Sequence, residues 1–226
     1  MRRTVPLQAV LLTLAFVSIL HGAEPATRPA AAPFEKSILA FEKSDRENPP
    51  PQNANLFIGS SSIAKWKTLA ADFPGVPVIN RGFGGSRIAD STRNVSRIVL
   101  PYHPRRIFFY AGDNDLAGKH TPEQVAADFK AFVDAVRCGD AHVPIYFISI
   151  KPSPKRIALI DAMRQANKLI EAYTHEAADV HYIDIFTPML GADGQPRPEL
   201  FLPDKLHMVH AGYEIWMAQI APLLKD

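Results

Sequence analysis

The sequence predicts a three-layer α/β domain with a mainly parallel β-sheet. Five short apolar runs alternate along the chain with segments in which apolar residues recur at helical spacing. The runs are apolar throughout, as expected for strands in a sheet that helices cover on both faces. With 226 residues, the chain is long enough for one such domain with a substantial core.

Three of the predicted strands lead into turns that contain glycine. Gly59 follows the first run, residues 82–85 follow the second, and Gly112 follows the third. Ligands bind beyond the carboxyl ends of parallel strands, so these turns are the expected location of a site. The five runs are Leu56–Ile58, Pro77–Asn80, Ile107–Tyr110, Val143–Ile150 and Val180–Ile185.

The segments between the strands carry helix signals. The clearest is Thr121-Pro122-Glu123-Gln124, a capping box with proline at the first helical position. Apolar residues follow it at helical spacing, and Gly139 fits just past the helix end. Further helices are expected within residues 88–99, from Ser153 to about Ala177, over Ala211–Leu224 and, as one short helix, over Phe34–Ser44.

The N-terminus has the features of a signal peptide. Arg2 and Arg3 precede an apolar run from Val5 to Leu20, and small residues follow it. The run is short for a membrane span of about 20 residues, although a permanent anchor is the alternative. We expect residues 1–23 to direct Sec-type export to the periplasm or the medium. Residues 24–51 would then form a leader or linker with a possible short helix, and residues 52–226 the functional domain.

The composition argues against nucleic acid as a partner. The formal charge is +2, and the sequence contains no block of basic residues. A small-molecule or glycan substrate is the expected partner. Cys138 is the only cysteine, so no internal disulfide can form, and we expect it to fill space in the core.

The turn after the first predicted strand contains Gly59-Ser60-Ser61-Ser62. A serine at a strand-to-helix turn has an exposed hydroxyl beside the free backbone N–H groups of the helix start. Those N–H groups can bind the oxyanion that a serine nucleophile generates. Taken alone, a helix cap is the simpler interpretation, because serine is favoured at that position.

The turns after the second and third strands contain Gly84-Gly85-Ser86 and Gly112-Asp113-Asn114-Asp115. Glycine allows a ligand to approach the backbone closely, and an asparagine amide can face a developing negative charge. Turn formation and helix capping are the alternatives for both segments. Arg81, Arg87 and Lys151 lie near these strand ends and could meet an anionic substrate, although internal ion pairs are the simpler interpretation.

Asp204 and His207 near the C-terminus have the spacing of a catalytic acid and base. Residues three apart in a turn face the same side, so the carboxylate can reach the imidazole. Such a contact fixes the histidine tautomer that accepts a proton from a nucleophile. The pattern alone is common by chance. His210 is a rival base, but no carboxylate precedes it by three residues.

Taken together and in this order, the four segments resemble the four blocks of the SGNH (GDSL-type) hydrolase family. Its name refers to serine, glycine, asparagine and histidine in separate blocks, here Gly59-Ser60-Ser61, Gly84-Gly85-Ser86, Gly112–Asp115 and Asp204 with His207. The resemblance covers roughly residues 52–222. It implies a flavodoxin-like fold with a five-stranded, mainly parallel sheet, and an ester hydrolase without metal or organic cofactor.

The resemblance also implies roles for single residues. Ser61 would be the nucleophile, His207 the base and Asp204 the group that orients it. The oxyanion hole would consist of the backbone N–H groups of Ser61 and Gly85 and the side chain of Asn114. Ser60 stands where the family usually has aspartate, which leaves Ser60 and Ser62 as alternatives to Ser61.

Two other functions compete with the esterase. A metal-dependent phosphoesterase would use hard oxygen and nitrogen ligands from Asp113, Asp115, Asp204 and His207. A non-catalytic, exported glycan-binding module would use none of them chemically. Because no long apolar lid segment separates the blocks, we expect short acyl chains. Carbohydrate acetyl esters, lysophospholipids and thioesters all remain open as substrates.

Overall fold

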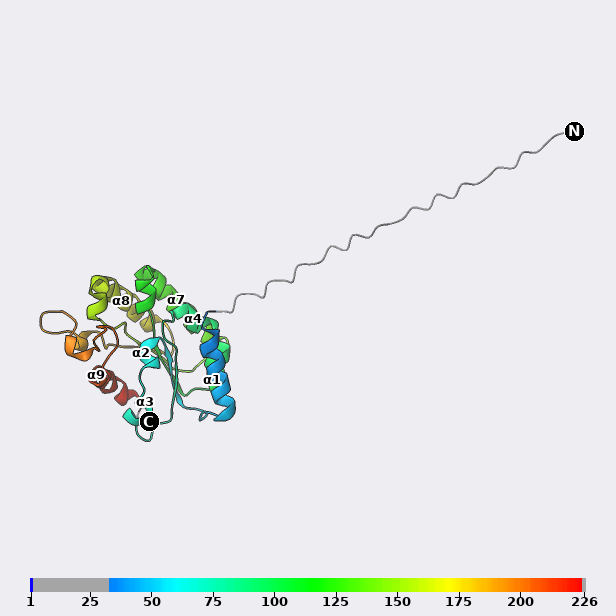
Figure 1. Cartoon of the computed structure of the whole chain (residues 1–226), viewed down its shortest axis with the longest axis horizontal. Coiled ribbons are helices and arrows are strands. Elements are labelled where there is room, and N and C mark those ends of the chain that lie inside the picture. The colour runs from blue at the N-terminus through cyan, green and yellow to red at the C-terminus, as the bar shows by residue number, and fades with distance from the viewer. Residues whose placement is uncertain (2–32, 225–226) are drawn as a thin grey trace. The chain divides into compact units, whose positions relative to one another are not determined.

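The computed structural model describes Met1 and residues 33–224. Within the described residues, five strands form one sheet in the order β2-β1-β3-β4-β5, and each neighbouring pair is parallel. The predicted α/β fold with a five-stranded parallel sheet is therefore confirmed (Figure 1). The strands are β1 (Asn55–Gly59), β2 (Val78–Gly82), β3 (Arg106–Tyr110), β4 (Ile145–Ile148) and β5 (Val180–Ile183).

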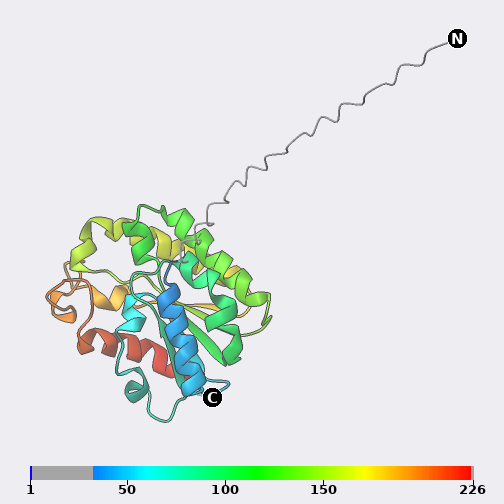
Figure 2. The same cartoon turned by 45° about the vertical axis from the view of Figure 1, so that its right-hand side comes forward.

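Helices cover both faces of the sheet. Leu56 and Ile58 of β1 contribute to the core on one face, whereas Phe57 contributes to the core on the other. Figure 2 shows α9, in red, on the opposite side of the strands from the green helix α7. The first face is covered by α1 (Glu35–Glu47), α4 (Ile88–Arg93), α5 (Val95–Ile98), α7 (Pro122–Arg137) and α8 (Ile160–Glu176). The second is covered by α2 (Ser61–Ala64), α3 (Leu69–Asp72) and α9 (His210–Ile220).

The remaining elements are short. α6 (Asp113–Ala117) follows β3 directly, and 3-10 turns complete the connections. The 3-10 turns are η1 (Leu100–Tyr102), η2 (Pro154–Leu159), η3 (Thr187–Met189), η4 (Pro198–Leu200) and η5 (Ala221–Leu224).

The direction in which the sheet is extended reverses between β1 and β3. From β1 the chain moves outward to β2, then returns across β1 to form β3 on its other side. Connections diverge at the carboxyl ends of such a strand pair, which is where α/β sheets bind ligands. Ser61 follows β1 and Asn114 follows β3, so two predicted site residues lie just beyond the carboxyl ends of this strand pair.

The compact unit that contains the sheet spans Ala32–Asp226 and includes α1. Ile38 of α1 is fully buried in the core, and Arg97 of α5 binds Glu35 and Glu42 at 2.8 and 2.6 Å. The short helix that was expected over Phe34–Ser44 thus packs on the domain.

The prediction for Cys138 is wrong, because its side chain is exposed. The buried face of α7 includes Phe132, Val133 and Val136. Cys138 comes two residues after Val136, which turns it to roughly the opposite side of the helix.

The predicted signal peptide lies, apart from Met1, outside the described residues. Residues 24–32 of the predicted leader also fall there. Among the helices of the described residues, none is both long and apolar enough to cross a membrane.

Candidate active site

The turn between β1 and α2 delivers Ser61 to the carboxyl edge of the sheet. Gly59 ends β1 with a φ of 139°, and a Cβ there would lie 1.8 Å from the carbonyl oxygen of Tyr110 on β3. Only glycine fits this position. The Ser60 N–H donates to the same carbonyl at 2.9 Å, and the Tyr213 hydroxyl of α9 donates to the Ser62 carbonyl at 2.9 Å. These contacts fix the turn from both sides.

Of the three consecutive serines, Ser61 is the one that faces His207. Its Oγ lies 3.0 Å from Nε2 of the imidazole. The hydroxyls of Ser60 and Ser62 are buried, and no hydrogen bond joins either of them to His207. The arrangement therefore favours Ser61 over its two neighbours.

Asp204 and His207 belong to a tight loop between residues 201 and 208. Phe201 and Met208 form an isolated antiparallel bridge, and the Leu202 N–H donates to the His207 carbonyl at 2.7 Å. Lys205 adopts a φ of 59°, which reverses the chain. The loop brings the carboxylate within 2.6 Å of the imidazole Nδ1.

The two carboxylate oxygens of Asp204 have different hydrogen-bond partners. Oδ1 accepts the backbone N–H groups of Leu206 and His207, both at 2.9 Å, while Oδ2 faces Nδ1 of His207. Hydrogen bonds from the His207 side chain and backbone hold the pKa of Asp204 well below its usual range. An ionised carboxylate only accepts, so Nδ1 carries the imidazole proton and Nε2 is free to accept from Ser61.

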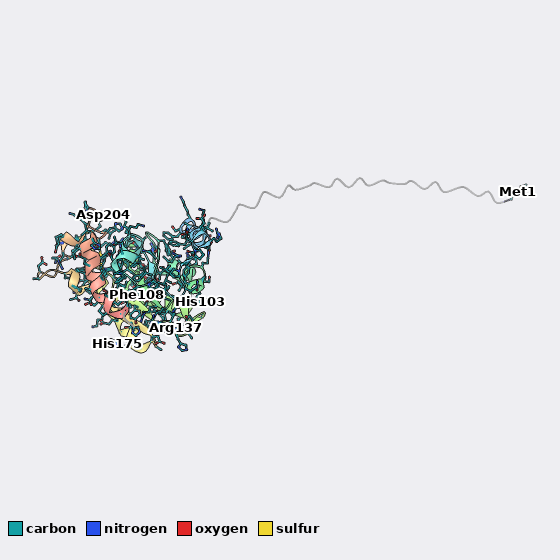
Figure 3. All side chains as sticks on the ribbon, turned by 90° about the horizontal axis from the view of Figure 1, so that it is seen from below. Met1, His103, Phe108, Arg137, His175 and Asp204 are labelled. Atoms are coloured by element: carbon teal, nitrogen blue, oxygen red, sulfur yellow. The ribbon has the colours of Figure 1, made fainter. Side chains whose placement is uncertain are left out.

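This loop lies at one end of the molecule. Figure 3 shows Asp204 on the opposite side from Arg137 and His175, which lie in the last turns of α7 and α8. Helices that return antiparallel to the strands end at the amino edge of the sheet. Asp204 therefore lies toward the carboxyl edge, together with Ser61.

The predicted oxyanion donors lie on the neighbouring connections. Gly85 has a φ of 84°, a left-handed conformation that favours glycine, in the connection from β2 to α4. A Cβ on Gly84 would lie 3.8 Å from Cβ of Ser61, so this connection runs alongside the serine. Asn114 of α6 donates through Nδ2 to the Ser86 carbonyl at 3.0 Å, which links it to the same connection.

A buried charge network lies behind Asn114. Asp113 accepts from Nζ of Lys151 at 3.2 Å and pairs with Nη1 of Arg156 at 3.0 Å, and Nη2 of Arg156 donates to Oδ1 of Asn114 at 2.7 Å. Burial alone would raise the pKa of Asp113, but the two cations hold it below its usual value. Burial lowers the pKa of Lys151, and Asp113 opposes that shift. Lys151 is thus ion-paired inside the protein.

No feature of the sequence marks Arg156 as a site residue. It lies in an irregular 3-10 turn where no residue pattern marks a function. A signal existed at Lys151, because a lysine at the end of an apolar strand run needs a buried partner. Identifying Asp113 as that partner requires knowing that β3 and β4 are neighbours.

The other residues considered from the sequence have structural contacts. Arg81 pairs with Asp45, and its guanidinium donates to the Tyr102 hydroxyl at 2.7 Å. Arg87 lies 3.3 Å from Nε2 of His120. His210 lies 4.0 Å from both Asp72 and Glu214. The aromatic residues Phe83, Tyr110 and Phe201 are buried in the two cores.

The residues of the metal-dependent alternative do not gather in one place. Asp113 is paired with two cations, and Asp204 is bonded to His207. Within the part of the chain that the structure describes, acids and histidines with ligand atoms within 4.8 Å of one another occur at Asp115, His120 and Asp128. That group shares only Asp115 with the predicted ligand set.

Comparison with protein families identifies the chain. The family model of the GDSL-like lipase/acylhydrolase family matches residues 57–215. The chain belongs to this family. The match includes every residue of the predicted triad and oxyanion hole. Among curated proteins, none matches the chain.

Solved structures share the fold of this GDSL-like family member at low sequence identity. A protein from Streptococcus pneumoniae named for platelet activating factor superposes with a TM-score of 0.75 and 20% identity, over 84% of this chain and 92% of that one. A GDSL-like lipase from Bacteroides thetaiotaomicron gives 0.70 and 20%, over 83% and 96%. An acetyl-xylooligosaccharide esterase from a Geobacillus species gives 0.59 and 15%, over 78% and 96%.

Proposed function

We propose that this family member is a serine esterase that hydrolyses short-chain acyl esters through Ser61, His207 and Asp204. The observation that carries the proposal is the continuous path from Ser61 Oγ to His207 at 3.0 Å and from His207 to Asp204 at 2.6 Å. These are the distances that proton transfer from a nucleophile to an oriented base requires.

The reaction proceeds in two halves. Ser61 Oγ attacks the ester carbonyl while Nε2 of His207 takes its proton, and the protonated imidazole then gives that proton to the leaving alcohol. In the second half, water attacks the acyl-enzyme carbonyl while His207 accepts its proton, and the imidazolium returns that proton to Ser61 Oγ as the bond to the acyl group breaks and the acid leaves. Asp204 holds the required tautomer throughout and stabilises the imidazolium.

The backbone N–H groups of Ser61 and Gly85 and the amide of Asn114 bind the oxyanion in this mechanism. Ser61 is the first residue of α2, so its N–H lacks a partner within the helix. One N–H of Asn114 is used by the Ser86 carbonyl, and its second N–H remains for the substrate. Removing this donor should reduce turnover on the order of 10²–10³-fold.

The side chains on the connections around Ser61 support the expectation of short acyl chains. The nearby aromatic side chains Phe83, Tyr110 and Phe201 are packed into the cores and do not offer an apolar acyl channel. Structural relatives include an acetyl-xylooligosaccharide esterase. An acetyl group on a carbohydrate is therefore the substrate that we favour.

The test compares Ser61→Ala with Ser62→Ala, its matched control with a buried hydroxyl. Hydrolysis of p-nitrophenyl esters of rising chain length and of acetylated sugars should be lost in S61A and kept in S62A, with the highest rate for the shortest chains. A fluorophosphonate probe should label the wild type and S62A only. Wild-type hydrolysis by S61A would overturn the proposal.

The two alternatives give different outcomes in the same assays. A chelator should abolish the activity of a metal-dependent phosphoesterase and leave the serine esterase unchanged. A glycan-binding module without catalysis should show neither turnover nor rapid labelling of serine.

We also propose that residues 1–23 direct export. The basic start and the short apolar run support this proposal. N-terminal sequencing of the protein recovered from the periplasm or the medium should give a chain that begins near residue 24, whereas a chain retained with its first 23 residues would contradict it.

A further inference from the structure

Asn114 lies between two groups of opposite polarity. Its Oδ1 accepts from Nη2 of Arg156 at 2.7 Å, and its Nδ2 donates to the Ser86 carbonyl at 3.0 Å. A guanidinium has only donors, and a backbone carbonyl has only an acceptor. Each neighbour therefore tolerates one end of the amide and rejects the other.

The inverted amide would be unfavourable at both contacts. Nδ2 would face the guanidinium donor, and Oδ1 would face the Ser86 carbonyl oxygen. The inverted amide would also slow ester hydrolysis, because it would direct the Asn114 carbonyl oxygen at the oxyanion, where the mechanism needs an N–H. Without Arg156, only the bond to Ser86 would select the active orientation.

Arg156 is itself held in a fixed position. Its Nη1 pairs with Asp113 at 3.0 Å, and Lys151 binds the same carboxylate oxygen at 3.2 Å. The side chains of Asp113 and Lys151 are 4% and 1% exposed. A buried ion pair at the end of β4 thus anchors the guanidinium that meets Asn114.

We propose that Arg156 is a positioning residue for ester hydrolysis, which sets the amide of Asn114 so that one N–H stays directed at the reacting carbonyl oxygen. The inference rests on the proposed function. Arg156 has a second effect in the same direction, because a charged donor on Oδ1 polarises the amide and strengthens its N–H as a donor.

The test uses Arg156→Met and Arg156→Lys, each alone and combined with Asn114→Ala. Methionine removes both contacts and keeps an unbranched, flexible chain in place of the arginine stem. Lysine keeps the charge, but it cannot reach two partners with a planar fork. Lys155→Met is the matched control, because it removes the positive charge of the adjacent, exposed residue. No side-chain contact joins Lys155 to Asn114.

The expected result is a change in kcat and not in KM. R156M should lower kcat on the order of tenfold, which is less than the 10²–10³-fold loss from removing an oxyanion donor. R156K should lie between R156M and the wild type, and K155M should match the wild type. In the N114A background, neither Arg156 substitution should lower kcat further, because the amide it positions is gone.

Three outcomes would overturn the inference. They are an R156M enzyme with wild-type kcat, an effect on KM alone, and an effect of equal size in the N114A background. If circular dichroism shows that R156M does not fold, the inference is tested with R156K, alone and combined with N114A, and the same three outcomes would overturn it.

Failure of this inference can be told apart from failure of the proposed function. If N114A and S61A lose activity while R156M and R156K keep it, only the role of Arg156 is wrong. If S61A keeps full activity, the esterase proposal itself fails.

Discussion

At the level of single residues, Asp204 controls which nitrogen of His207 carries the proton. In Asp204→Asn, Oδ1 can keep its two backbone N–H donors, which turns the new Nδ2 toward Nδ1 of His207. Nδ1 must then accept, so Nε2 carries the proton and cannot take one from Ser61. We expect kcat to fall on the order of 10³–10⁴-fold with a small change in KM. Steady-state kinetics on p-nitrophenyl acetate measures this, and a loss below twofold would exclude an orienting role.

Asp115, two residues from Asp113, is a buried acid with the opposite surroundings. Burial raises its pKa to about 6, although its Oδ1 accepts from the Ile88 N–H at 3.2 Å. A raised pKa favours the protonated carboxyl in the folded state. Its contribution to the free energy of unfolding is complete below the unfolded pKa of about 4 and is lost as the pH rises through about 6.

Asp115→Asn should therefore gain stability over the wild type as the pH rises. The difference in unfolding free energy, variant minus wild type, should increase by roughly 2–3 kcal/mol between pH 4 and pH 7. Urea unfolding at the two pH values measures it. Asp113→Asn is the control with the opposite sign, because it leaves Lys151 and Arg156 buried without their anion and should destabilise at pH 7. A difference for D115N that does not change with pH would contradict the raised pKa.

Local patterns in the sequence could nominate some of the site residues, but they could not assign them. Ser61 follows a strand and a glycine, and His207 follows Asp204 by three positions, yet each pattern alone is common, and the assignment depended on the resemblance of all four segments to one family. The choice among three serines needed the structure, because the direction of each hydroxyl depends on the turn that Gly59 and Tyr110 impose. The contact of Arg156 with Asn114 joins residues 42 positions apart, and no local pattern encodes it.

At the level of elements, α1 raises the question of whether charge or burial holds it on the domain. Ile38 is fully buried, whereas the ion pairs of Arg97 join side chains about 30% exposed. Removing a buried isoleucine side chain costs roughly 2–4 kcal/mol, while exposed ion pairs contribute up to about 1 kcal/mol. Burial should dominate.

The corresponding test compares Ile38→Ala with Arg97→Gln in urea unfolding. I38A should lose roughly 2–4 kcal/mol and R97Q less than about 1 kcal/mol. Leu39→Ala, at a side chain that is 50% exposed, is the control on the same helix and should change little. An R97Q loss larger than that of I38A would reverse the ranking.

Element boundaries were less predictable than element types. The helix expected to begin at Ser153 starts as the 3-10 turn η2 and becomes α-helical only at Ile160. Tertiary contacts explain the difference, since the Lys155 N–H donates to the Lys205 carbonyl and Arg156 reaches Asn114. A regular helix from Ser153 would give up these contacts, and the sequence of the segment alone does not specify them.

At the level of the whole molecule, one aromatic cluster supports both halves of the proposed triad. The chain has two tryptophans, Trp66 and Trp216, and both pack on Tyr213 with ring centroids 4.9 and 6.1 Å away. The same core contains Ile63 of α2, two residues after Ser61, and Met208 at the end of the loop formed by residues 201–208, called here the histidine loop. Ser61 and His207 are therefore held by the same packing, although 146 residues separate them.

Loss of activity and loss of tryptophan packing should consequently coincide. In urea, esterase activity and tryptophan fluorescence are expected to show the same midpoint, since both report on this core and a single compact unit unfolds cooperatively. Tyr213→Phe removes the hydroxyl that donates to the Ser62 carbonyl and should cost about 1 kcal/mol. It should lower both midpoints equally. If activity disappears at a lower urea concentration than the fluorescence change, the histidine loop opens independently, and the shared core does not position the triad.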